Sequence, residues 1–205
     1  MQATLHDPIS TSNCAPLTHG RALGDCLVAN HRLKELITTE LSQAGFDMVP
    51  NARATERTVH LPMDHWIEVG ALCLLARSDT ATCLRDNRGD LIAWKGADTA
   101  DACGSDMVTQ AHCFRIQYPW DLLQLNEEVL SMMDTSEIAG EISPLAQVDG
   151  YLHLGRGSVL LPGVYIEGNV IIGKNCRIGP NTYIRGNTAI GDHCTIGNSA
   201  EVKNS

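Results

Sequence analysis

The sequence predicts a mixed α/β domain followed by a left-handed parallel β-helix made of six-residue repeats. Stepping by six from Ile142 reaches an unbroken series of aliphatic residues that ends at Val202. A fixed short period of this kind is typical of a solenoid, in which each repeat buries its apolar side chain against the next coil.

Two further columns of the repeat obey the same geometry. The position four residues after each aliphatic is nearly always small, as at Ala146, Ser158 and Cys176. In seven of the repeats the position three residues after the aliphatic carries Gly, Asn or His: Gly157, Gly163, Asn169, Asn175, Asn181, Asn187 and His193. Gly and Asn tolerate the positive φ that a tight corner between short strands requires. Three such hexads make one triangular coil.

The first part of the chain shows no repeat and is predicted to be α/β. Apolar spacing predicts a helix over 31–44, which Gly45 ends, and a second helix near 72–76. Segments 81–84 and 90–94 flank Asn87-Arg88-Gly89, the sequence of a hairpin turn. A further helix is expected over 122–133, with Pro119 in its first turn.

These elements divide the chain into three predicted parts. Residues 1–133 form the α/β domain, 134–141 a linker, and 142–205 the β-helix. The repeats stop partway through a fourth coil, so the β-helix is expected to be incomplete and the chain to be a fragment of a longer protein.

The charge and the hydropathy of the sequence argue against some classes of function. The net charge of −9 argues against general affinity for nucleic acid. No apolar run approaches the roughly 18 residues of a membrane span, and the start lacks a signal-peptide pattern, so we expect a cytoplasmic protein without a membrane partner. Residues 141–205 carry five basic and five acidic side chains. A β-helix with flat faces and no net charge favours association between copies of the chain. We therefore expect a homotrimer that assembles through the β-helix.

Two stretches resemble sugar-1-phosphate nucleotidyltransferases that carry a C-terminal β-helix. The first comprises Asp7-Pro8, Pro16-Leu17-Thr18, Arg21, Asp25 and Val28-Ala29-Asn30; the second comprises Tyr118-Pro119-Trp120-Asp121-Leu122-Leu123 and Asn126. With the repeats, the similarity covers about half of the chain. The pattern is most similar to a divergent bacterial branch, the bifunctional UDP-N-acetylglucosamine pyrophosphorylases and glucosamine-1-phosphate acetyltransferases.

The resemblance implies substrate-binding residues in the β-helix. Arg185 stands where the family has a phosphate-binding Arg, and the stretch Asn198–Lys203 resembles the strand that carries a sugar-phosphate-binding Lys. Both cations suit an anionic sugar phosphate or nucleotide sugar. The family's general base is a His about a dozen residues after that Lys, a position beyond Ser205. Acetyl-CoA and Mg²⁺ are the cofactors that the resemblance implies.

The N-terminal domain departs from the common phosphate-binding loop. The family's glycine positions hold Ile9 and Thr11, and its Lys position holds Leu23, which cannot neutralise phosphate. Arg21 and Asp25 remain its best nucleotide-site candidates.

Two other candidates can be interpreted in more than one way. Asp64 follows an apolar run and is interpreted either as a turn residue or as a metal-binding carboxylate. His193 is a weak catalytic candidate, since it is either a corner residue or a basic group between subunits. No Cys or His spacing predicts a metal site.

Two functions therefore remain open. The first is a transferase of amino-sugar nucleotide biosynthesis, acting as a nucleotidyltransferase, an acetyl-CoA-dependent N-acetyltransferase, or both. The alternative is a non-catalytic assembly or regulatory protein with a degraded nucleotidyltransferase domain.

Overall fold

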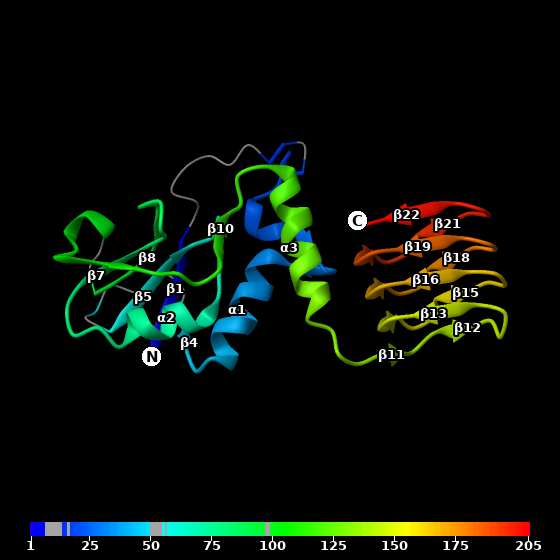
Figure 1. Ribbon diagram of the computed structural model, residues 1–205, viewed down its shortest axis with the longest axis horizontal. Helices are drawn as coiled ribbons and strands as arrows, with labels where there is room; N and C mark the ends of the chain where they lie inside the picture. The colour runs from blue at the N-terminus through cyan, green and yellow to red at the C-terminus, as the bar shows by residue number, and fades with distance from the viewer. Residues whose placement is uncertain (7–13, 16, 50–54, 56, 97–98) are drawn as a thin grey trace. The chain divides into compact units, whose positions relative to one another are not determined.

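A computed structural model describes residues 1–6, 14–15, 17–49, 55, 57–96 and 99–205 (Figure 1). Contacts divide them into two compact units. The first comprises Met1–Cys26 and Arg32–Asp121, and the second comprises Leu27–His31 and Leu122–Ser205. Asp7, Pro8 and Pro16 of the first resemblance motif lie outside the described residues, as do Ile9 and Thr11.

The first unit is built on a six-stranded mixed sheet. Its order is β4 (Asp47–Met48), β1 (Gln2–His6), β5 (Thr58–Pro62), β8 (Leu91–Lys95), β7 (Thr82–Arg85) and β9 (Ser105–Val108). Parallel pairing joins β4, β1 and β5, and also joins β7 to β9, whereas β8 is antiparallel to both of its neighbours. Every strand of this sheet except β8 therefore runs in one direction, and the carboxyl ends of five strands meet at one edge.

The helices of the first unit follow the predicted periodicity. Helix α1 (Leu33–Gln43) buries Leu33, Ile37 and Leu41, one residue per turn, and the chain leaves it through Gly45 at φ +85°. Helix α2 (Val69–Ala76) contacts β5, β7 and β8. The predictions of helices over 31–44 and 72–76 are confirmed, and so is the hairpin of β7 and β8.

The remaining short elements complete the description of the N-terminal region. They are the 3-10 turns η1 (Leu23–Asp25) and η2 (Ala100–Ala102), the hairpin of β2 (Leu27–Val28) with β3 (His31–Arg32), and the antiparallel pair of β6 (His65–Ile67) with β10 (Cys113–Arg115). Helix α3 (Pro119–Ser131) has Pro in its first turn, as predicted, but it begins and ends a few residues before the predicted range 122–133.

The second unit contains three sheets of four parallel strands each. Their orders are β11-β14-β17-β20, β12-β15-β18-β21 and β13-β16-β19-β22. The strand bounds are Glu137–Ile138, Glu141–Ile142, Gln147–Asp149, Leu152–Leu154, Val159–Leu160, Tyr165–Glu167, Val170–Ile172, Arg177–Ile178, Tyr183–Arg185, Thr188–Ile190, Thr195–Ile196 and Glu201–Lys203 for β11 to β22. From β12 on, each strand pairs with the strand eighteen residues later, whereas β11 pairs with β14 sixteen residues later. Figure 1 shows the coils stacked from β11 to β22. This is a parallel β-helix with triangular coils, consistent with the predicted left-handed one.

The inward column of the six-residue repeat forms the core of this unit. Leu160, Ile166, Ile178 and Ile184 are fully buried, and the small-residue column supplies Val164, Val170 and Cys176 beside them. The strand β11 falls within the predicted linker 134–141, since Glu137 and Ile138 pair with β14. The coils therefore begin earlier than residue 142. The six-residue period did not show this, because Ile138 pairs with Leu154 at sixteen residues and lies outside the register of Ile142.

The corners agree with the prediction at two edges of the prism and differ at the third. Asn175, Asn181 and His193 have φ of 55°, 51° and 59°. At the third edge the positive φ falls one residue earlier than expected, on Gly168 and Gly186. This releases the following side chains, Asn169 and Asn187, for other contacts.

These two asparagines join α3 to the β-helix. The Oδ1 of Asn187 accepts the N–H of Asn169 on the previous coil at 3.1 Å. The Nδ2 of Asn169 donates to the Leu130 carbonyl at 2.9 Å, and that of Asn187 donates to Ser131 Oγ at 2.8 Å. The carbonyls at the end of a helix lack intrahelical partners, so the corner serves as a cap for α3.

Candidate functional site

The predicted cations Arg185 and Lys203 lie side by side on one face of the β-helix. Each is the last residue of its strand, and the two are register partners on β19 and β22. Neighbouring strands are about 4.8 Å apart. Because Ile184 points inward and is fully buried, the residue next to it points outward. The structure therefore brings these two predicted ligands of one phosphate together.

Arg185 contacts other side chains on the same face of the β-helix. Its Nε donates to Glu201 Oε1, and its guanidinium lies 5.9 Å from the centre of the Tyr183 ring. The hydrogen bond that Arg185 donates to Glu201 raises the pKa of Arg185 above its ordinary value, so the side chain is a permanent cation. Lys203 is exposed and makes no ion pair with the residues that the structure describes.

Aromatic side chains line the same face. The rings of Tyr165 and Tyr183 stack with centroids 5.3 Å apart and planes 10° from parallel. Tyr165 donates its hydroxyl to Asp149 at 2.7 Å, and this bond raises the pKa of Tyr165 to about 12. Tyr183 donates in the same way to Glu167, which raises the pKa of Tyr183. The face is an ordered ladder of paired polar groups beside the two cations.

The other two predicted residues of the β-helix lie at different corners. Asn198 is exposed in the turn between β21 and β22, where its Oδ1 accepts from Asn181 Nδ2 at 3.3 Å. His193 is exposed in the turn between β20 and β21, and its backbone N–H donates to the Lys174 carbonyl at 2.8 Å. Within one chain, His193 is therefore on a different edge from Arg185. Its left-handed backbone agrees with the interpretation as a corner residue.

The structure does not bring together the nucleotide-site candidates of the N-terminal domain, Arg21 and Asp25. Asp25 ends η1 and forms ion pairs with Lys34 at 2.6 Å and with Arg32 at 3.3 Å. The hydrogen bond from Lys34 is the main cause of a lowered pKa of Asp25. Arg21 is exposed in a bend. These contacts give Asp25 a local structural role in the described part of the chain.

Asp64 is in the turn between β5 and β6, as one interpretation expected, yet its side chain is fully buried. Its two oxygens contact His65 Nδ1 at 3.1 Å and Arg115 Nε at 2.9 Å. Burial alone would raise the pKa of Asp64, but the hydrogen bonds from His65 and Arg115 outweigh it and leave the pKa lowered. The carboxylate is thus held ionised in the interior.

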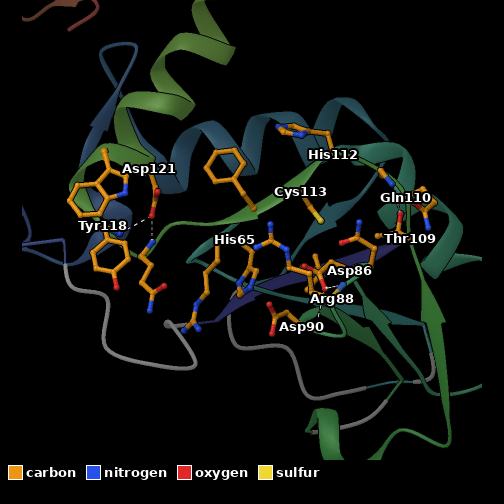
Figure 2. A pocket seen from close by; sticks show the side chains of 17 residues that line it. His65, Asp86, Arg88, Asp90, Thr109, Gln110, His112, Cys113, Tyr118 and Asp121 are labelled. Atoms are coloured by element: carbon orange, nitrogen blue, oxygen red, sulfur yellow. Dashed lines mark hydrogen bonds between the residues drawn. The ribbon is translucent and has the colours of Figure 1, made fainter.

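A cavity of about 670 Å³ lies beside this cluster at the carboxyl edge of the sheet (Figure 2). Its lining includes His65 after β5, Asp86 and Arg88 after β7, Thr109 after β9, and Tyr118 before α3. The sequence motifs did not predict this cavity, because its residues come from three separate stretches of the chain, at position 65, at 86–92 and at 109–121. The only local signal was the resemblance that drew attention to Tyr118–Asp121.

Two searches of the described residues were negative. No group of three or more His, Cys, Asp or Glu side chains there could hold a metal ion, so those residues show no cluster for the Mg²⁺ that the resemblance implies. None of the helices there is long and apolar enough to cross a membrane.

Comparison with known proteins supports the repeat assignment. A family model described as bacterial transferase hexapeptide (six repeats) matches residues 151–186 and 172–204. A search of curated proteins gave no match to the chain. The C-terminal part is therefore a hexapeptide-repeat domain of the kind found in bacterial transferases.

Proposed function

We propose that the chain is a transferase of amino-sugar nucleotide biosynthesis whose β-helix binds a sugar phosphate for acetyl transfer. The observation that carries the proposal is the adjacency of Arg185 and Lys203 in register on β19 and β22. Two cations at strand spacing can both contact one phosphate, with Arg185 as the fork-shaped donor. The hexapeptide match supports the transferase class.

The proposed reaction is a direct transfer. The amine of a hexosamine phosphate attacks the thioester carbon of acetyl-CoA; the new C–N bond forms, the C–S bond breaks, and CoA leaves as the thiol. A basic group takes the proton from the amine. His193 is the candidate in this chain, and its distance from Arg185 around the prism favours a site completed by a neighbouring subunit of a homotrimer.

The N-terminal domain is proposed to serve the same pathway as a sugar-1-phosphate nucleotidyltransferase. The support is the resemblance at Arg21, Asp25 and Tyr118–Asn126, together with a sheet whose carboxyl ends meet at one edge. In open α/β sheets ligands bind at that edge. The nucleotide sugar would be its product.

The acetyl transfer is tested by thiol release. The full chain is mixed with acetyl-CoA and glucosamine 1-phosphate, and free CoA is measured with a thiol reagent. We expect release that depends on both substrates. If CoA release at high protein concentration does not exceed the no-protein rate, the acetyltransferase proposal is wrong.

Arg185→Ala should weaken binding of glucosamine 1-phosphate about tenfold or more, because a charge-assisted pair to phosphate is lost. The β-helix should remain folded, since Arg185 points outward. The matched control is Arg177→Ala, an exposed arginine on the outer side of β18. Calorimetry checks both variants; equal affinities for them would remove Arg185 from the site.

Glu201→Gln should strengthen the binding of glucosamine 1-phosphate. Glu201 neutralises Arg185 in the structure, so a neutral amide leaves the guanidinium free to pair with phosphate. We expect binding up to several-fold tighter than in the wild type, because an exposed ion pair of this kind is weak and is readily replaced by a pair with phosphate. Weaker binding in calorimetry would mean that Glu201 holds Arg185 in its binding position instead.

A further inference from the structure

The cavity of the N-terminal part contributes nothing to the acetyl transfer proposed for the β-helix, and neither Arg21 nor Asp25 lines it. We infer that it is a nucleotide-binding site, with the base stacked on Trp120 and the phosphate held by Arg88 and Arg115. Its volume of about 670 Å³ is in the usual range for a small-molecule site. The inference rests on the nucleotidyltransferase function proposed for this domain and names its nucleotide site. Nucleotide binding that is unchanged in the variants below would reject the site alone, whereas no nucleotide binding would reject both.

An aromatic platform forms one wall of the cavity. Tyr118 and Trp120 stack with centroids 4.6 Å apart and planes 17° from parallel. Asp121 fixes this segment, because its Oδ2 accepts the N–H groups of Gln117 at 2.7 Å and Tyr118 at 2.8 Å. Trp120 nevertheless remains 61% exposed. A rigid, exposed indole beside a polar cavity is suited to stacking with a nucleobase.

Two arginines supply the charge for a phosphate. Arg88 lies in the turn between β7 and β8, which Asp86 fixes by accepting the N–H groups of Arg88 and Asp90, both at 2.8 Å. The Arg88 side chain makes no ion pair with the described residues. Arg115 is oriented by Asp64 through its Nε. Both side chains line the cavity, and guanidinium groups bind phosphate oxygens strongly.

His65 adds a polar group to the lining of the cavity. The residue is only 3% exposed, and Asp64 Oδ1 lies 3.1 Å from its Nδ1. Asp64 thus orients the ring. Nε2 makes no hydrogen bond with the described residues, so it can contact a ligand.

The polar groups of the lining suit both parts of a nucleoside. Asp86 and Asp121 each use one oxygen to accept backbone N–H groups, so their other oxygens and Asp90 can accept from ribose hydroxyls (Figure 2). The amides of Gln110 and Gln117 also line the cavity. Each offers a donor and an acceptor, the pattern that pairs with the edge of a base.

Titration of the full chain tests the inference. The probes are adenosine 5′-monophosphate, uridine 5′-monophosphate, glucose 1-phosphate and inorganic phosphate. Binding is followed by calorimetry and by tryptophan fluorescence, since Trp120 is exposed whereas Trp66 and Trp94 are buried. We expect at least one nucleotide to bind and quench the fluorescence, and glucose 1-phosphate and phosphate to bind at least about tenfold more weakly because they lack the stacking base.

Substitutions of single residues test whether the nucleotide binds in this cavity. Trp120→Ala should weaken nucleotide binding about tenfold or more, and Trp120→Phe should keep most of the affinity, because the ring can still stack. Arg88→Ala should also weaken binding about tenfold, whereas Arg77→Ala, an exposed arginine outside the cavity, should not. Three results would overturn the inference: no nucleotide binding at millimolar concentration, equal binding of glucose 1-phosphate, or nucleotide binding unchanged in both Trp120→Ala and Arg88→Ala.

Discussion

Ile178→Ala should lower the free energy of unfolding of the β-helix by about 2–5 kcal/mol, the largest effect expected from one substitution in this chain. Ile178 belongs to the inward column and is fully buried between the strands of two adjacent coils. Removing three carbon atoms there loses their transfer free energy and leaves a cavity that paired strands on both sides cannot close. Urea unfolding followed by far-UV circular dichroism measures the change.

Ile142→Ala is the matched control. Ile142 occupies the same column of the repeat two coils earlier, with the same alternation of its neighbours, but it is 37% exposed because no coil precedes it. The same truncation should cost about 1 kcal/mol there, since less apolar surface leaves water and no closed cavity forms. Equal losses for Ile142 and Ile178 would contradict the inward register on which the fold rests.

The comparison of these two residues shows why the β-helix could be predicted from sequence. In a solenoid each side chain is placed by its own position in the repeat, so a local period specifies burial, corner and register together. Ile166 and Ile184 are buried partners on neighbouring coils, as the eighteen-residue spacing requires. The adjacency of Arg185 and Lys203 follows from the same spacing.

The prediction was weakest where the repeat contacts something outside itself. Asn169 and Asn187 occupy the corner column, but a preceding glycine takes the positive φ and their side chains bind α3 instead. The two-residue pattern is visible in the sequence as Gly-Asn at 168–169 and 186–187. The partner helix, however, is tens of residues away in the chain, and no period connects the two.

The N-terminal cavity could not be predicted either, because it too depends on contacts between residues that are far apart in the sequence. Its elements were predictable, because helix periodicity and the Asn87-Gly89 turn are local signals. The cavity depends on the order of six strands, which brings the ends of β5, β7 and β9 to one edge. Sheet order is determined by long-range pairing, and a single sequence carries little information about it.

Asp64→Asn should produce the second large effect, a loss of about 2–3 kcal/mol of unfolding free energy at pH 7. The substitution keeps the shape of the side chain but removes the buried negative charge that accepts from His65 and Arg115. Arg115 is 36% exposed in its side chain and can regain some hydration, so the loss should be smaller than for a fully buried pair. Asp79→Asn, at an exposed position without an assigned partner, should change the stability by less than about 0.5 kcal/mol.

The pH dependence of the unfolding free energy distinguishes the contribution of the Asp64 charge from that of its side-chain shape. The pKa of Asp64 is lowered in the folded protein, so below its unfolded pKa of about 3.9 the unfolded state binds a proton that the folded state does not. The stabilisation by the carboxylate is therefore complete above about pH 4 to 5 and is lost as the pH falls through the folded pKa. Asparagine cannot titrate, so the gap between wild type and Asp64→Asn should be constant from pH 7 to pH 5 and should narrow below pH 4. A gap that stayed the same at pH 3.5 would mean that the carboxylate contributes through its hydrogen-bonded shape and not through its charge.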